Sequence, residues 1–209
     1  MKLTRLILMI LVGLVAAPLM GATQTPDPLT TVKEPVEEVL KVLKDPQYAE
    51  GRNREDQQKK IRAIATEAFD FVEISKRALA RGWKQFTPDE RRRFTDRFTE
   101  LLLNSYTRQI QSEYSDEEVA FQDQQMVSEN KASVKSVITR EGVETPVNYS
   151  LIQRKDRWRI YDIQIEGVSL VGNYRTQFRK ILAKETPDQL IARIEEKIAA
   201  NEDQITTQE

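Results

Sequence analysis

Apolar residues recur every three to four positions through most of the first half of the chain, which predicts amphipathic helices. The stripe over residues 32–43 ends where Asp45 precedes Pro46, because a residue before proline is disfavoured in helical conformation. A second stripe covers residues 61–72. The clearest helix starts at Thr87, where a Thr N-cap, a proline and then Glu90 form a capping box. Its apolar face consists of Phe94, Phe98, Leu101, Leu102, Tyr106 and Ile110.

From about residue 119 the period changes, and apolar and polar side chains alternate as in antiparallel strands with one covered face. Four strands are predicted, over residues 119–124, 132–140, 143–154 and 157–168. Tight hairpin turns are needed between these strands, and they are expected at residues 141–142 and 155–156. Pro146 has no backbone N–H, so we expect its strand at a sheet edge, or bulged there.

The chain returns to helix after the last strand. Residues 166–169 turn the chain, and residues 169–183 carry a new helical stripe. A second capping signal at residues 186–189 starts a helix through Ile198, and the tail is polar from about residue 201. The pattern predicts an α+β domain, in which helices cover one face of a twisted antiparallel sheet of about four strands. The same stripes fit a fully packed core or a hydrophobic pocket between sheet and helices.

The N-terminus has the features of a secretory signal peptide. Lys2 and Arg5 precede an apolar run over residues 6–15, and small residues follow before a polar stretch. The run is shorter than the roughly 20 residues of a transmembrane helix, so we expect cleavage rather than an uncleaved anchor. Cleavage after Ala22 gives a signal peptide over residues 1–22 and a single exported domain over residues 23–209; cleavage after Ala17 is the alternative.

The composition excludes several kinds of chemistry. The chain has no His and no Cys, which removes Ser-His-Asp and Cys-His catalytic constellations and the usual zinc sites. Without disulfides, packing alone must hold the exported domain. The 32 Lys and Arg and 33 Asp and Glu give a net charge of −1, whereas nucleic-acid-binding domains are usually basic. We therefore expect no nucleic-acid partner, metal or cofactor.

Carboxylate pairs are the remaining catalytic candidates, as in glycoside hydrolysis. Asp162 and Glu166 near the end of the last strand are the pair to consider, with Asp70 as a third. The alternative is a structural role, in which they cap or salt-bridge where the strand leaves the sheet; Glu166 is also near the helix that follows Ser169. We favour the structural role and expect that the protein is not an enzyme.

Four segments resemble the periplasmic phospholipid-binding proteins of the toluene-tolerance, Mla-type lipid transport pathway. They are FDF..ISKRAL (residues 69–79), W…TPDERRRFTDRFTELLLNSY (83–106), PVNYSLIQ (146–153) and RWRIYDIQIEGVSLVGNYRTQF (157–178). Each is weakly specific alone, but four in this order, behind a signal peptide and in a chain of this length, are a strong resemblance.

The resemblance implies a soluble periplasmic carrier, most simply a monomer, that holds phospholipid acyl chains in an apolar pocket between sheet and helices. It implies transport of lipid between outer and inner membranes, which maintains outer-membrane lipid asymmetry. The implied partners are an inner-membrane ABC transporter with a substrate-binding ring domain and an outer-membrane lipoprotein complex. Two other functions fit the sequence: a periplasmic chaperone or adaptor with an apolar groove, and a cone-shaped α+β enzyme using Asp162 or Glu166.

We predict that the pocket is lined from both the sheet and the helices, although each of these residues also fits an ordinary core. The predicted lining residues are Val134, Val147, Tyr149, Leu151, Ile163 and Ile165 in the sheet, and Phe98, Leu102, Leu170, Val171, Tyr174 and Phe178 in the helices. Arg175 and Arg179 lie one turn apart on the helix face opposite Phe178, where they fit headgroup contacts, a partner protein or a plain exposed face.

Overall fold

The computed structural model describes residues 27–155 and 157–206, so the expected signal peptide and the last three residues lie outside the described residues. The helices are α1 (Pro28–Lys44), α2 (Arg54–Ala68), α3 (Phe71–Leu79), α4 (Pro88–Glu113), α5 (Leu170–Leu182) and α6 (Pro187–Thr206), with 3-10 turns η1 (Pro46–Gly51) and η2 (Ala80–Gln85). The strands are β1 (Glu118–Ser128), β2 (Lys131–Arg140), β3 (Val143–Arg154), β4 (Arg157–Ile165) and β5 (Val168–Ser169).

The strands form one antiparallel sheet in the order β1-β2-β3-β4-β5, which confirms the α+β prediction. The fifth strand is short, and it arises because the predicted strand over residues 157–168 is divided by a turn. Glu166 and Gly167 have φ values of 50° and 81° there, and Glu141 and Gly142 have φ values of 50° and 80° in the β2–β3 turn. Two consecutive positive φ values are characteristic of the tight hairpin turns that match strand twist.

The expectation that Pro146 lies in an edge strand or at a bulge is wrong, because β3 lies between β2 and β4 and its register shift falls at Ser150 and Leu151. Pro146 is opposite Val137 of β2, but it lies beyond Val147 and Ile165, the last pair with β4. Its carbonyl accepts a hydrogen bond from the N–H of Glu166 at 3.0 Å, so the carbonyl and the backbone nitrogen of Pro146 both point toward β4. The regular pairing with β4 has ended there, so no ladder hydrogen bond is lost because Pro146 has no N–H. An interior strand therefore accommodates a proline where one neighbour stops.

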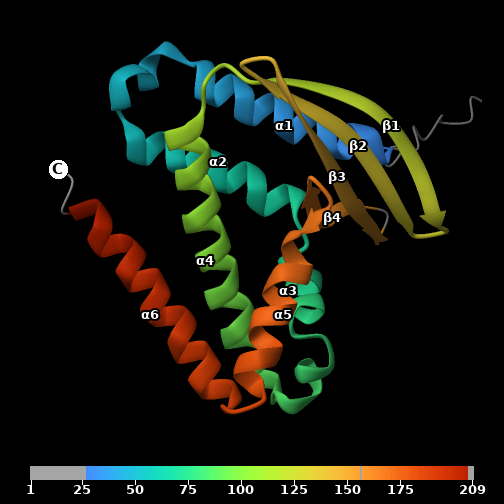
Figure 1. Cartoon of the computed structure of the whole chain (residues 1–209), viewed down its shortest axis with the longest axis vertical. Coiled ribbons are helices and arrows are strands. Elements are labelled where there is room, and N and C mark those ends of the chain that lie inside the picture. The colour runs from blue at the N-terminus through green and yellow to red at the C-terminus, as the bar shows by residue number, and fades with distance from the viewer. Residues whose placement is uncertain (1–26, 156, 207–209) are drawn as a thin grey trace, which may run out of the picture.

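The domain has a sheet region and a helical region (Figure 1). The sheet curves over α1, which packs on β1, β2 and β4 and pairs with α2. Below the sheet, α4 packs against α6, and α3 packs against α5. Within residues 27–155 and 157–206, no helix combines the length and apolar character needed to span a membrane.

The predicted helix starts are confirmed. The N–H of Thr87 donates to Glu90 Oε2 at 2.7 Å and the N–H of Glu90 donates to Thr87 Oγ1 at 3.3 Å, which completes the capping box of α4. The N–H of Thr186 likewise donates to Gln189 Oε1 at 2.8 Å before α6. α6 continues to Thr206, beyond the predicted apolar stripe.

The stripe over residues 61–72 is not one helix, because the chain breaks between α2 and α3. Phe69 is extended (φ −100°, ψ 145°) and forms a parallel bridge with Ile160 of β4. The N–H of Asp70 donates to the carbonyl of Ile160 at 2.9 Å, and its carboxylate accepts from the N–H of Glu73 to start α3. The break joins the helices to the sheet at this point.

Candidate functional site

The predicted lining residues fall into two apolar clusters rather than one. The helical cluster is formed by α3–α6 and contains Phe98, Leu102, Val171, Tyr174 and Phe178, with Leu170 packed at its margin. The sheet cluster contains Val134, Val147, Tyr149 and Leu151, with Ile163 at its margin. Ile165 belongs to neither cluster and is 50% exposed. The structure therefore separates most of the sheet residues from the helix residues that were expected to face them.

Aromatic rings fill the helical cluster. Phe98 contacts Phe94, Tyr174 and Phe178, with centroid separations of 5.4, 4.9 and 5.1 Å, and two of these three contacts are edge-to-face. Phe94 also meets Phe178 edge-to-face at 5.4 Å. Edge-to-face contacts of this kind stabilise beyond the area they bury. These rings fill the space between α4 and α5.

The sheet residues instead face α1 and the end of α2. Val32 of α1 and Ala68 of α2 are buried in the sheet cluster, and Leu29 and Val36 pack at its margin. Sequence reasoning assigned no lining residue to either helix. The signal was present in the apolar stripe over residues 32–43, but a stripe does not identify the surface that it covers.

Phe69 connects the two clusters, since it packs against both. It occupies the break between α2 and α3, directly beside Ile160 in the sheet cluster. Its ring lies 5.9 Å from that of Phe71, which packs against the helical cluster. Phe69 therefore lies where the two predicted halves of the lining meet.

Two buried tyrosines add polar atoms to the clusters. Burial raises the pKa of Tyr149 in the sheet cluster and, together with the neighbouring Tyr106, that of Tyr174 in the helical cluster. Both phenols are therefore neutral at neutral pH. Neutral hydroxyls inside apolar surroundings can orient a polar group of a ligand without introducing charge.

Two of the three carboxylates considered for catalysis, Asp162 and Asp70, have structural contacts. Asp162 Oδ2 accepts from the Ser169 hydroxyl at 2.6 Å, and its Oδ1 accepts from the N–H of Val171 at 3.0 Å, so it holds the start of α5. Glu166 lies in the exposed β4–β5 turn. Asp70 caps α3 and pairs with Arg154 at 3.3 Å. Asp162 and Asp70 thus have the capping and salt-bridging contacts expected from the sequence.

A charged group joins the sheet to α3. The buried Glu73 carboxylate pairs with Arg154 of β3 and with Arg77, whose Nε lies 2.7 Å from it. The Arg77 guanidinium lies 3.9 Å from the ring centroid of Tyr161 in β4. The polar junction and Phe69 thus connect the sheet region to the helical region.

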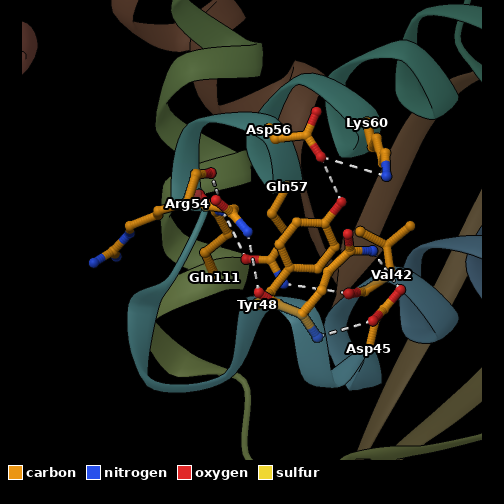
Figure 2. Close-up of polar contacts among 10 residues, drawn as sticks. Val42, Asp45, Tyr48, Arg54, Asp56, Gln57, Lys60 and Gln111 are labelled. Atoms are coloured by element: carbon orange, nitrogen blue, oxygen red, sulfur yellow. Dashed lines mark hydrogen bonds and ion pairs between the residues drawn. The ribbon is translucent and has the colours of Figure 1, made fainter.

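A second polar group fixes the turn between α1 and α2 against α4 (Figure 2). Tyr48 donates its hydroxyl to Asp56 at 2.6 Å, and this bond lowers the pKa of Asp56 and raises that of Tyr48. Gln57 donates to the carbonyl of Val42 at 3.3 Å and accepts from Gln111 of α4 at 2.9 Å. These bonds set the position of the α1–α2 pair relative to α4.

Two further features of the described residues bear on the position of a site. The described part of the chain has no group of three or more Asp or Glu side chains placed to hold a metal ion. An open depression at the end of α1 lies outside both clusters, and it is lined by Glu37, Leu40, Lys41, Lys44, Asp45 and Pro46.

Comparison with known proteins identifies the family. No curated protein sequence matches the chain. The structure is similar to that of a phospholipid-binding protein from Ralstonia solanacearum, solved in complex with a phospholipid, with a TM-score of 0.75 and 25% sequence identity. The likeness covers 84% of this chain and 99% of the other. The sequence profile described as MlaC protein matches residues 33–196, which is more than half of the chain, and this protein therefore belongs to the MlaC family.

Proposed function

We propose that this protein is a soluble periplasmic phospholipid carrier and not an enzyme. The observation that carries the proposal is the likeness over 99% of a chain that was solved with a phospholipid bound. Membership of the MlaC family supports it. Two of the three candidate carboxylates, Asp162 and Asp70, are engaged in capping and an ion pair, which agrees with a binding function.

The acyl chains would lie between the sheet cluster and the helical cluster, in contact with Phe69. Leu170 and Ile163 are partly buried at the margins of the two clusters, and Tyr106 of α4 is 36% exposed beside Tyr174. These side chains can receive an apolar ligand with less disruption than the closely packed Phe98 and Phe178. The other predicted lining residues would contact the ligand only where the clusters separate to admit it.

Transfer energetics explain why such a carrier needs no reactive group. A diacyl lipid has roughly 30 methylenes, and each costs about 0.8 kcal/mol to expose to water, so unassisted passage is opposed by about 20 kcal/mol. An apolar site that matches the bilayer interior removes this barrier. The direction of transfer must then be set by partners with different affinities for the lipid-loaded and empty protein.

We further propose that the mature domain exchanges lipid with an inner-membrane ABC transporter bearing a ring domain and with an outer-membrane lipoprotein complex. This exchange would maintain outer-membrane lipid asymmetry. Export by a cleaved signal peptide over residues 1–22 places the domain over residues 23–209 in the periplasm.

The test is native mass spectrometry of the mature protein purified without detergent, followed by lipid extraction. We expect one or two phospholipids per chain. A lipid-free mass, with no uptake from phospholipid vesicles, would contradict the proposal and favour a chaperone or adaptor.

A further inference from the structure

The charges of α3, η2 and α5 are one-sided apart from Glu73 of α3, which is buried and paired with Arg77 and Arg154. Residues 74–85 contain four Lys or Arg and no Asp or Glu, and α5 (Leu170–Leu182) contains three and none. The remainder of the chain has 25 Lys and Arg against 33 Asp and Glu. A protein that is acidic elsewhere thus concentrates positive charge in two segments that are distant in the sequence.

The fold brings these two segments together. α5 packs against both α3 and η2 (Figure 1). Arg175 Nε donates to the backbone carbonyl of Arg77 at 2.9 Å, so the helix face that carries Arg175 lies beside the C-terminal end of α3. We define the cationic face as the exposed side chains of these segments, Lys76, Arg81, Lys84, Arg175, Arg179 and Lys180.

The cationic face has no internal neutralisation. Among the described residues, none of its six side chains has a carboxylate oxygen within 4.0 Å. By contrast, Arg93 pairs with Asp188 at 2.8 Å and Arg193 pairs with Glu185 at 2.6 Å. Uncompensated charge of one sign gathered on one surface favours association with a polyanion.

We propose that the cationic face docks the protein on an anionic phospholipid membrane. Clusters of four to eight Lys and Arg bind anionic lipid surfaces because each cation near the surface adds to the attraction. Arginine guanidinium groups also donate paired hydrogen bonds to phosphate oxygens.

The chemistry of the cationic face favours a membrane over an acidic protein. Val72 of α3, 57% exposed, is the one exposed large apolar side chain that α3, η2 and α5 present, whereas the centre of a stable protein–protein interface is depleted in charge and enriched in apolar groups. A fluid bilayer requires no matching shape. α5 would then face the membrane with Arg179, while its opposite side holds Tyr174 and Phe178 in the helical cluster. This docking rests on the proposed function in one respect only, which is that the membrane supplies the phospholipid that the protein carries.

The test measures flotation of the mature protein with vesicles of phosphatidylcholine alone or with about 30% phosphatidylglycerol, at low and high salt. We expect binding only to the anionic vesicles, and weakening by salt because the attraction is screened. The variant Arg81→Gln, Arg179→Gln, Lys180→Gln spares Arg175, which contacts α3. Each cation removed should lower the vesicle partition coefficient about fivefold, so this triple variant should lower it about 100-fold.

The matched control, Lys41→Gln, Lys44→Gln, Lys59→Gln, removes the same charge from exposed residues of α1 and α2. We expect it to lower binding less than fivefold. Equal losses in the two variants, or no binding of the unaltered protein at low salt, would overturn the proposal, and the second result would favour an acidic protein partner. Lipid loading of both variants by native mass spectrometry should be unchanged; a protein that binds vesicles but carries no lipid would contradict the proposed function alone.

Discussion

The helical cluster has fifteen buried residues and seven partly buried neighbours, whereas the sheet cluster has eight buried residues and also seven partly buried neighbours. Four helical elements enclose the first, and α1 with the end of α2 covers the second. A close-packed interior resists volume change, so the helical cluster is suited to hold the fold. The sheet cluster has more partly buried neighbours for each buried residue. We therefore expect a ligand to enter on the side of the sheet cluster.

The largest expected effect is on stability in the helical cluster. Phe98→Ala removes a ring with three aromatic contacts and should lower the free energy of unfolding by about 3–5 kcal/mol. The control is Phe121→Ala, which removes a partly buried ring at the margin of the sheet cluster. Urea denaturation followed by circular dichroism measures both, and an equal loss from Phe121→Ala would erase the difference between the clusters.

A matched pair of leucines separates stability from lipid binding. Leu101 and Leu151 are 2% and 0% exposed in the helical and sheet clusters, so replacement of either by Ala should cost about 2–5 kcal/mol. Only Leu151→Ala should also lower the phospholipid content per folded chain several-fold, measured by lipid extraction. A greater loss of lipid from Leu101→Ala would place the ligand in the helical cluster.

A charge at the margin should affect lipid more than stability. Leu170 is partly buried at the first position of α5, where a carboxylate is favoured by the helix dipole, so Leu170→Asp should cost only about 1 kcal/mol. A charge against acyl chains is strongly unfavourable, and lipid loading should fall below one-tenth. Asn173→Asp, at an exposed position of the same helix, is the control and should load normally.

The smallest expected effect is on alkaline stability. Burial raises the pKa of Tyr149 and Tyr174. A raised phenol pKa contributes stability that is fully present below about pH 10, the pKa in the unfolded chain, and lost as the pH rises through the folded pKa. Tyr149→Phe and Tyr174→Phe should each reduce the fall in the urea midpoint between pH 8 and pH 11.

Comparing the two Tyr variants with and without bound phospholipid sharpens the contrast between the clusters. The Tyr174→Phe variant retains Tyr149, and the Tyr149→Phe variant retains Tyr174. If the lipid lies on the sheet side, it should change the alkaline titration of phenolate absorbance in Tyr174→Phe. A titration that lipid changes only in Tyr149→Phe would place the ligand in the helical cluster instead.

Local signals in the sequence predicted the elements that depend on nearby residues. The capping boxes at Thr87 and Thr186 and the turn at Glu141 and Gly142 are confirmed, because the groups that form them are within four residues of each other. The break at Phe69 was missed, since its cause is pairing with Ile160, ninety-one positions away in the sequence.

The sequence by itself determined that this chain is an α+β domain without His or Cys, with apolar faces on its helices and sheet and a family resemblance that four segments carry. The tertiary structure decided which faces meet. It placed Val134 and Leu151 in one cluster with Val32 of α1, and Phe98 and Phe178 against each other in the helical cluster. Hydrophobic burial is non-directional, so an apolar stripe specifies that it will be covered without specifying by what.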